Sequence, residues 1–271
     1  MPELPEVEIT RRSIEPVLKG QILRRVSQSD KALRWPLGCD PQELVGQRVH
    51  ELQRRGKYIL LRLDHGWLMI HLGMSGRLVT RAQLPAAGVH DHFECITDLG
   101  GIRLHDPRRF GAVIHVNDLA SGMALKLLSG LGIEPFSNEF TPAYLAQGLA
   151  RRSAPIKQVL LAGDVVVGVG NIYASESLFL AGINPKRKAN TLSKKSIEKL
   201  HAAIIQVLHR ALEIGGSTLK DFYSPDGEHG YFQLEARVYD REGQPCHVCA
   251  NPIKRMVQGQ RATYFCSTCQ R

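Results

Sequence analysis

Residues 48–80 read RVHELQRRGKYILLRLDHGWLMIHLGMSGRLVT, and this stretch decides the fold of the first part of the chain. It contains four short apolar runs, alternating or β-branched, that are separated by glycine or by charged residues. Further runs of this kind precede and follow it, so that eight lie between residues 21 and 116 without a helical pattern among them. Many short strands with no intervening helix favour an antiparallel sandwich or barrel.

Helices are expected on both sides of this β region. Before it, the segment Pro5–Leu18 starts with proline and places Glu6 and Glu8 in its first turn, although Pro16 argues against a helix that runs to Leu18. After Asn117 the apolar residues recur at helical spacing, most clearly between a capping Ser193 and the Gly215-Gly216 pair. The expected helical segments lie near residues 118–129, 141–150, 155–162, 171–181 and 193–214.

From about Arg237 to the C-terminus the chain is expected to form two short hairpins that carry four cysteines. We therefore expect an α+β protein built from consecutive modules. Their expected bounds are 1–117 for the β domain, 118–134 for a linker helix region, 135–223 for a helical domain, 224–236 for a loop region and 237–271 for the cysteine module.

The charge balance favours a polyanionic partner. The 35 Lys and Arg residues exceed the 26 Asp and Glu residues and give a net charge of +9. Such an excess suits an acidic polymer or an anionic surface, although dispersed basic clusters are also typical of ordinary solvated faces. The longest stretch without a charged residue has only twelve residues, between Asp64 and Arg77, so no helix is expected to span a membrane. The acidic, proline-containing start MPELPEVEI does not resemble a signal peptide, and a cytosolic location is expected.

Four of the six cysteines have the spacing of a metal site. Cys246 and Cys249 form one C-x2-C pair, and Cys266 and Cys269 form a second pair sixteen residues later. Two such pairs supply the tetrahedral sulfur shell that zinc prefers, with a redox dithiol as the alternative. Because all four ligands are sulfur, no position remains for water, and we expect one structural Zn²⁺ rather than a catalytic one.

The N-terminus can supply a nucleophile. If Met1 is removed, Pro2 presents a secondary amine, and α-amino groups titrate near about pH 8, which leaves a neutral fraction able to attack an aldehyde-level carbon. Glu3 and Glu6 stand nearby as candidate proton donors or acceptors. The alternative is that PELPE is only a favourable helix start.

Seven motifs, in order along nearly the whole chain, together resemble the bacterial formamidopyrimidine-DNA glycosylases, which are 8-oxoguanine glycosylase/AP lyases. The resemblance rests on MPELPEVE, Lys57 in RRGKYILL, HLGMSG at 71–76, DPRRFG at 106–111, VGVGNIYASESLF at 167–179, GGSTLKDF at 215–222 and the terminal cysteine module. It implies an N-terminal antiparallel β-sandwich with an N-terminal helix, a helix-two-turns-helix domain and a β-hairpin zinc finger.

The resemblance also assigns the chemistry. It implies that Pro2 attacks the anomeric carbon of a damaged nucleotide, with Glu3 as acid/base and Glu6 as its support. Lys57 is implied to be an essential basic residue that contacts the DNA near the lesion. Successive β- and δ-elimination from the resulting Schiff base would leave a single-nucleotide gap. From its position alone, Lys57 would instead be a charged edge-strand residue.

Eight further residues are implied to contact duplex DNA. A base inside a duplex has to be rotated out before a tethered amine reaches its sugar, and apolar or guanidinium side chains fill the hole. Plain core positions remain the alternative for Met74 and Phe110, and a hydrogen-bonded core histidine for His71. Lys220 lies in the region implied to recognise the base, where His229 replaces the family's common proline. The implied DNA-binding residues are His71, Met74, Arg108, Phe110, Lys157, Asn171, Lys220 and Arg261.

The resemblance thus predicts a monomeric base-excision enzyme that acts on double-stranded DNA with oxidised purines or abasic sites. A related alternative is the endonuclease VIII type, which prefers oxidised pyrimidines. An alternative from another class is a zinc-dependent DNA-binding protein without catalytic activity, whose mature form would retain Met1.

Overall fold

The structure, a computed structural model, describes residues 2–216 and 232–271 and divides into two compact units. Among the described residues, the first unit holds 2–129 with 215–216, and the second holds 130–214 with 232–271.

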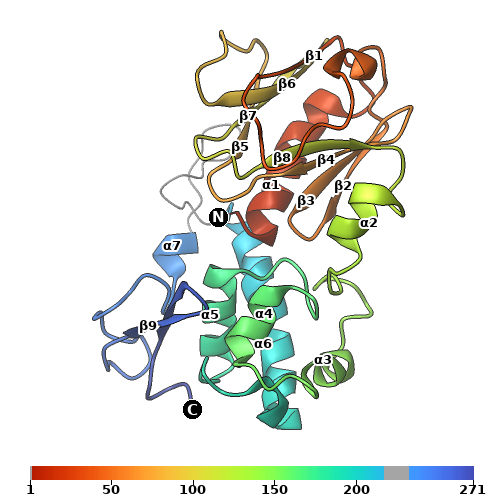
Figure 1. Ribbon diagram of the computed structural model, residues 1–271. Coiled ribbons are helices and arrows are strands. Elements are labelled where there is room, and N and C mark those ends of the chain that lie inside the picture. The colour runs from red at the N-terminus through yellow and green to blue at the C-terminus, as the bar shows by residue number, and fades with distance from the viewer. Residues whose placement is uncertain (1, 217–231) are drawn as a thin grey trace. The chain divides into compact units, whose positions relative to one another are not determined.

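Two four-stranded antiparallel sheets form the first unit, so the sandwich is confirmed and the barrel alternative is wrong (Figure 1). All eight predicted runs form strands. One sheet has the order β1 (Arg25–Gln28), β6 (Asp91–Thr97), β7 (Gly100–His105) and β5 (Arg77–Arg81). The other has the order β2 (Glu51–Arg55), β3 (Tyr58–Arg62), β4 (Trp67–His71) and β8 (Ala112–Val116).

The second sheet is covered on both faces, which explains the continuous apolar runs of β3 and β4. Side chains alternate between the two faces of a strand. Ile59 and Leu61 join the core shared with the first sheet, whereas Leu60 and Met69 join a smaller cluster with α2 (Gly122–Leu128). The predicted linker helix is therefore packed against the β domain.

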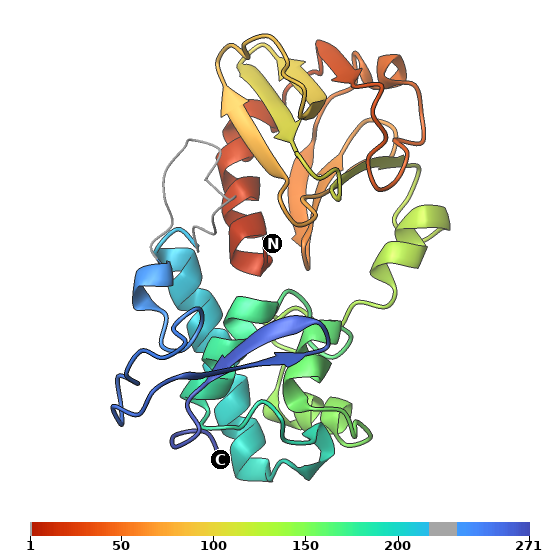
Figure 2. The ribbon, with the colours of Figure 1, turned by 60° about the vertical axis from the view of Figure 1, so that its left-hand side comes forward.

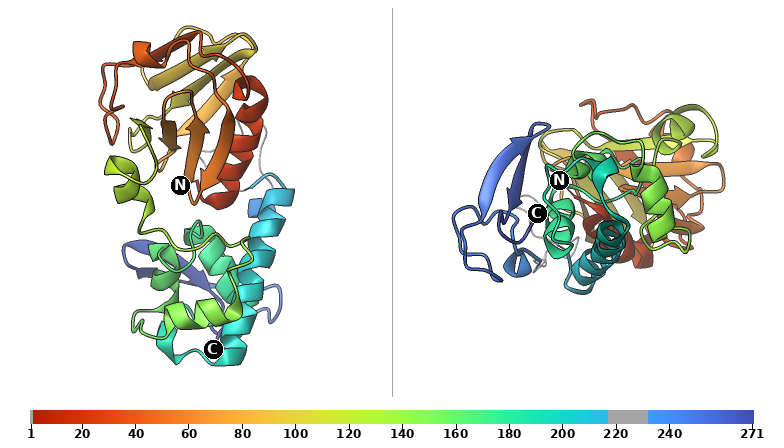
Figure 3. Two further views of the ribbon diagram at one scale, coloured as in Figure 1. Left: turned by 90° about the vertical axis from the view of Figure 1, so that its right-hand side faces the viewer. Right: turned by 90° about the horizontal axis from the view of Figure 1, so that it is seen from below.

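Helix α1 (Leu4–Leu18) contacts strands of both sheets, namely β2, β3, β5 and β7 (Figure 3). Its Leu4, Val7 and Ile14 are buried. The helix predicted over Pro5–Leu18 is confirmed in spite of Pro16, because proline in the last turn removes only one backbone hydrogen bond near the helix end. A short 3-10 helix, η1, spans Pro41–Leu44.

The second unit contains the last four predicted helices and the cysteine module. Ser193 caps α6 through Ser196 N–H, and the helix ends just before Gly215, whose φ of 79° favours glycine. In Figure 2 the hairpin β9–β10 can be followed beside α5, which β10 contacts. The elements are α3 (Pro142–Leu149), α4 (Ile156–Ala162), α5 (Asn171–Leu180), η2 (Ala189–Thr191), α6 (Lys194–Glu213), α7 (Phe232–Glu235), β9 (Lys254–Gln258) and β10 (Arg261–Phe265).

One of the two expected cysteine hairpins is shorter than predicted. The β9–β10 pair forms a full ladder, whereas the first cysteine loop has a single bridge between Pro245 and Pro252. Two prolines in this segment leave fewer backbone donors for a ladder. Within the described ranges, no helix is long and apolar enough to cross a membrane.

Candidate active site

The start of the chain is held at the beginning of α1 by two buried carboxylates. The Glu3 backbone N–H donates to the Glu6 carboxylate at 2.9 Å, and the Glu3 carboxylate accepts in turn from the Glu6 backbone. This reciprocal capping box satisfies two backbone donors at the helix start. Glu3 is 2% exposed and Glu6 is fully buried. Pro2, also buried, is therefore joined directly to a fixed pair of acids.

The chain returns to these acids just after α6. A β-carbon at Gly216 would stand 3.1 Å from Glu6 Oε1, and the φ of +77° at this residue also favours glycine. The segment GGSTLKDF thus begins beside the capping box. Lys220 and His229 lie outside the described residues, as does the loop at 224–231.

Lys57 stands at the tip of the β2–β3 hairpin and not within an edge strand. The strands are joined by Gly56-Lys57, and Arg55 pairs with Tyr58. Gly56 has a φ of 57°, as the first position of a type II′ turn requires. The two-residue turn fixes where the ammonium stem leaves the sheet.

His71 lies across from this hairpin tip and stays neutral at physiological pH. It pairs with Tyr58 across the β3–β4 ladder, and the ring centroids are 4.8 Å apart. Burial lowers the pKa of His71 to about 4, and the charges of Lys57 and Arg34 act in the same direction. The Gly73 N–H donates to Nδ1 at 3.1 Å, which leaves Nε2 to carry the proton. The ring therefore offers a neutral N–H donor.

Met74 and Phe110 are not core residues. Their exposed fractions are 36% and 42%, although both are large apolar side chains. The Arg108 guanidinium carbon lies 4.8 Å from the centre of the Phe110 ring, within cation–π range. Two loops of the first unit, at 73–76 and 107–111, thus carry the exposed apolar side chains of Met74 and Phe110 together with the cationic Arg108.

Asp106, which the sequence analysis did not single out, fixes both loops. It is fully buried, and its carboxylate accepts from Ser75 Oγ at 2.8 Å and from the backbone N–H groups of Arg108 and Gly111 at 3.2 and 2.7 Å. Its carbonyl accepts from His92 Nε2 at 3.1 Å. The available signal was the Asp-Pro pair that opens DPRRFG, a common turn start.

Three predicted residues meet at the start of β10 in the second unit. The Ala262 carbonyl accepts from Lys157 Nζ and from Asn171 Nδ2, both at 3.0 Å. Its neighbour Arg261 is half-buried and follows a two-residue turn at Gly259-Gln260, where both φ angles are positive. Asn171 is the first residue of α5, and a helix N-terminus has a partial positive charge that favours anions.

Lys157, which the resemblance implies lies close to the DNA, is a buried residue of α4. Its side chain is fully buried, and Nζ also donates to Thr263 Oγ1 at 2.7 Å. These two hydrogen bonds position the β10 strand that carries Arg261, and the place of Lys157 near the DNA stays a prediction.

The four predicted cysteines form one site. Their sulfur atoms all lie within 4.8 Å of one another, with Cys246 and Cys269 3.9 Å apart and Cys249 and Cys266 3.4 Å apart. Tetrahedral Zn²⁺ with Zn–S bonds of about 2.3 Å requires sulfur separations of about 3.8 Å. The donor set and its dimensions fit one structural zinc ion, which holds the loop at 246–249 to the end of β10.

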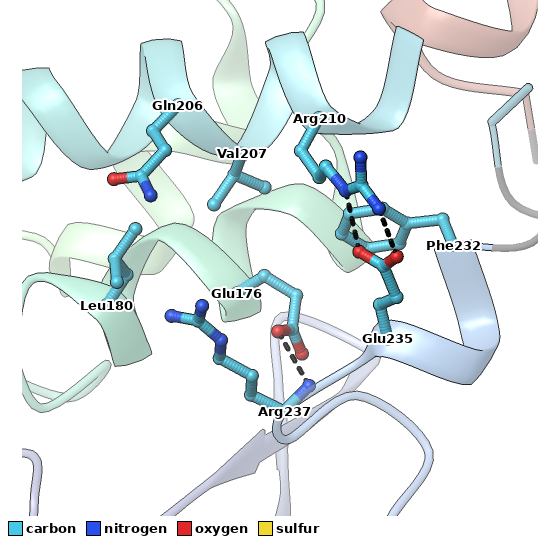
Figure 4. Close-up of a pocket in the computed structure, with 8 residues that line it drawn as sticks. All are labelled: Glu176, Leu180, Gln206, Val207, Arg210, Phe232, Glu235 and Arg237. Atoms are coloured by element: carbon cyan, nitrogen blue, oxygen red, sulfur yellow. Dashed lines mark hydrogen bonds and ion pairs between the residues drawn. The ribbon is translucent and has the colours of Figure 1, made fainter. Parts of the chain in front are cut away.

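Glu176, also missed in the sequence analysis, joins the cysteine module to α5 (Figure 4). Its carboxylate is 2% exposed and accepts from the backbone N–H groups of Arg237, Val238 and Tyr239 at 2.8, 2.9 and 2.8 Å. Burial raises its pKa, and the three hydrogen bonds partly offset that effect. The adjacent cavity of about 70 Å³ is too small for a nucleotide. A single acid within the apolar run NIYASESLFL was the signal for a buried acceptor.

Comparison with known proteins identifies the modules. Residues 1–113 match the formamidopyrimidine-DNA glycosylase N-terminal domain, residues 131–223 match the H2TH domain of the same glycosylase, and residues 243–271 match the zinc finger found in FPG and IleRS. A formamidopyrimidine-DNA glycosylase of Variovorax paradoxus is 56% identical, and the match covers both chains completely.

Solved structures agree over the same length. The MutM (Fpg) protein of Thermus thermophilus has a TM-score of 0.89 at 40% identity and covers 99% of this chain and 98% of its own. Lactococcus lactis Fpg in complex with N7-benzyl-Fapy-dG DNA has a TM-score of 0.90 at 32% identity, with complete coverage of both chains. The same Lactococcus protein is known in complexes with DNA containing an abasic site or an oxidised pyrimidine.

The order of the three modules defines a class, the helix-two-turns-helix proteins with an N-terminal β-sandwich and a C-terminal zinc finger. The sequence identity of 56% to the Variovorax glycosylase over the full length narrows the class to one family. The chain belongs to the formamidopyrimidine-DNA glycosylase family.

Proposed function

We propose that this protein is a bifunctional DNA glycosylase/AP lyase of base excision repair, which removes 8-oxoguanine and formamidopyrimidines from duplex DNA. The observation that carries the proposal is the capping box between the buried acids Glu3 and Glu6, which directly follow Pro2 at the start of α1. The family membership of the whole chain and the lesion complexes of the Lactococcus relative support the same reading.

The glycosylase step uses the amine of Pro2. Its lone pair forms a bond to C1′ of the damaged nucleotide while the bond from C1′ to the base breaks, and the base leaves with that electron pair and gains a proton. Glu3 is the acid/base that acts on the deoxyribose, and Glu6 holds the Glu3 backbone. The C1′–O4′ bond of the deoxyribose then breaks, with Glu3 giving a proton to O4′, and because Pro2 is a secondary amine the ring-opened adduct is a cationic iminium.

The lyase step uses that cation as an electron sink. Loss of a C2′ proton breaks the bond from C3′ to its phosphate oxygen. In a second elimination, loss of the C4′ proton breaks the bond from C5′ to its phosphate oxygen. Hydrolysis of the iminium then frees Pro2 and leaves a single-nucleotide gap with two phosphate ends.

After the damaged nucleotide is rotated out of the duplex, side chains from the exposed loops of the first unit fill the space that it leaves. In this proposal Met74 and Phe110 enter the stack and Arg108 faces the orphaned base. Replacement of Phe110 by alanine should weaken lesion-duplex binding at least tenfold, whereas Leu125→Ala, which truncates another exposed apolar residue of this unit, should not. Equal effects of the two changes would contradict the filling role.

Phosphate binding is assigned to both units. In the first unit, Lys57 and the neutral N–H of His71 bind phosphate. In the second unit, Asn171 and Arg261 bind phosphate, and Lys157 supports the strand that carries Arg261. We also infer one monomer per lesion, which analytical ultracentrifugation of the protein–duplex complex tests directly.

Product analysis tests the proposal. A duplex with 8-oxoguanine opposite cytosine should yield the free base and a gap with phosphate at both ends, and it should be cleaved faster than a thymine glycol duplex. A faster reaction on thymine glycol would instead support the endonuclease VIII type, which prefers oxidised pyrimidines. Intact Pro2 and zinc without release of either base would refute the enzymatic reading.

A further inference from the structure

A cluster of ion pairs joins helix α1 to the β2–β3 hairpin, at whose tip Lys57 stands. Glu8 of α1 is its central acid, and Arg54 of β2 is its member on the hairpin side. The side chains of Glu8 and Arg54 are only 13% and 11% exposed, so both are largely withdrawn from solvent. The helix contacts β2 and β3, and the three elements can be followed by colour in Figure 3. Neither side chain has a part in the proposed function so far.

Arg54 makes two directed contacts, one to the helix and one to the turn. Its Nε donates to Glu8 Oε2 at 3.2 Å, and its Nη1 donates to the Gly56 carbonyl at 3.0 Å. Gly56 is buried, and a buried carbonyl requires a hydrogen-bond donor. This carbonyl belongs to the peptide bond between Gly56 and Lys57, the two residues of the turn. Arg54 therefore ties the turn itself to α1.

Glu8 is a fixed anionic acceptor for Arg54. Its Oε1 accepts from Arg12 Nε at 2.8 Å and from Arg11 Nη2 at 3.1 Å. Burial by itself raises the pKa of Glu8, but the hydrogen bonds from Arg11 and Arg12 outweigh that effect and lower it. The carboxylate thus stays ionised at physiological pH, and hydrogen bonds between ionised groups are the stronger ones.

Arg11 adds a second connection between the same two elements. Its Nη1 donates to the Leu52 carbonyl at 3.3 Å, three residues before the turn-capping arginine leaves β2 at Arg55. The helix is therefore bonded to the hairpin at two points, one near the start of β2 and one at the turn.

The cluster connects Lys57 to the part of α1 that carries the candidate nucleophile. A helix rises about 1.5 Å per residue, so Glu8 lies about 7.5 Å along α1 from Glu3. The capping box between Glu3 and Glu6 fixes the helix start next to Pro2. A short path of hydrogen bonds and one rigid helix thus joins the turn at Lys57 to the start of the chain.

The proposed reaction requires this connection. Lysine is a point charge on a flexible stem, so the place of its ammonium depends on a fixed backbone. A phosphate bound by Lys57 and a C1′ atom within reach of Pro2 belong to one stretch of DNA, and small misplacements of reacting groups are costly. We infer that Arg54 is a positioning residue: it holds the Gly56-Lys57 turn to α1, so that Lys57 binds its phosphate while the sugar lies at the amine. The inference rests on the proposed function.

A double-mutant cycle tests whether Arg54 acts through Lys57. Arg54→Met removes both donors and keeps an apolar stem, and Lys57→Met removes the ammonium. The two single variants and the double variant are measured by their affinity for a duplex with a tetrahydrofuran abasic analogue. This analogue has no base and no leaving group at C1′, so neither base recognition nor chemistry contributes. Low ionic strength keeps the affinity measurable when one phosphate contact is lost.

The effect of Arg54→Met should depend on Lys57. It should weaken binding by about fivefold when Lys57 is present and by less than about twofold in the Lys57→Met protein. Glu8→Gln keeps the size of the side chain and one acceptor oxygen, and it should weaken binding by about threefold with the same dependence on Lys57. Each protein is measured below the onset of its thermal unfolding.

Arg12→Met is the matched control. It removes another donor to the same carboxylate, from a side chain that is 58% exposed. Exposed ion pairs contribute little, so the change in affinity should stay below about twofold. A loss as large as that of Arg54→Met would show that any damage to the cluster has the same effect, and it would overturn the specific role of Arg54.

Two further results would overturn the inference. An equal loss of affinity on Arg54→Met with and without Lys57 would mean that Arg54 contacts the DNA itself or acts on the fold in general. An unchanged affinity of Arg54→Met in the presence of Lys57 would mean that the turn needs no support. Binding of the analogue without cleavage of an 8-oxoguanine duplex by the wild type would instead contradict the proposed function, and the coupling between Arg54 and Lys57 would still be measured.

Discussion

Replacement of Glu176 by glutamine should weaken the attachment of the cysteine module to α5. In the wild type, Oε1 accepts from Val238 and Tyr239, and Oε2 accepts from Arg237. In Glu176→Gln one oxygen becomes an NH2 group, which faces a backbone N–H and leaves that donor unpaired. The two surviving hydrogen bonds also become neutral and weaken by roughly half.

The magnitude follows from these contacts. Loss of one hydrogen bond to a charged group costs about 1.5–3 kcal/mol, and the weaker survivors add about 1 kcal/mol. Removal of a buried charge returns part of that cost, since burial raises the pKa of Glu176. The net destabilisation is about 2–3 kcal/mol, which lowers the melting temperature by roughly 4–5 °C in a chain of this size.

The assay combines calorimetry with zinc release to a colorimetric chelator. Val238 packs with Cys246 and Cys266, so the variant should also lose zinc faster. Glu235→Gln is the matched control, because its carboxylate accepts from Arg210 at the surface of the same cavity, where ion pairs contribute little. Equal melting and zinc release in the two variants would refute the role of the buried acceptor.

Three further predictions concern the proposed DNA-binding surfaces. Asp106→Ala should destabilise the first unit to urea by about 2–4 kcal/mol, because Gly111 N–H and Ser75 Oγ lose their acceptor; a loss below about 1 kcal/mol would contradict this. The pKa of His71 is lowered to about 4 in the fold, against about 6.5 when unfolded, so protonation favours the unfolded state as pH falls below 6.5. Between pH 7.5 and 5 the free energy of unfolding of the wild type should fall by about 2 kcal/mol more than that of His71→Gln, and equal losses would contradict this. Arg261→Ala should reduce the salt slope of lesion-duplex binding by about 1, and an unchanged slope would exclude a phosphate contact.

Local patterns predicted the elements well. The apolar runs became the strands of the sandwich, and the helix from Ser193 begins and ends at its predicted signals. These features depend on side-chain periodicity, capping and glycine, all of which act over a few residues. The helix at 5–18 forms in spite of Pro16 because the cost of proline depends on its place in the helix, and only the final turn is affected here.

Burial of charged residues could not be predicted in this way. Lys157 is buried because its ammonium meets a carbonyl 105 positions later in the sequence. Asp106 and Glu176 are likewise satisfied by backbone N–H groups that the fold brings to them. Such partners are set by tertiary packing, so the motifs indicated which segments matter without showing which of their residues touch a ligand and which position the others.

Borohydride trapping with peptide mapping tests the central claim most directly. Reduction during the reaction on an 8-oxoguanine duplex should convert the iminium into a stable amine, and the proteolytic fragment that carries the sugar should begin at Pro2 with Met1 removed. A covalent adduct at Lys57 or any other lysine, combined with undiminished strand cleavage by a protein whose Pro2 nitrogen has been acetylated, would contradict the account.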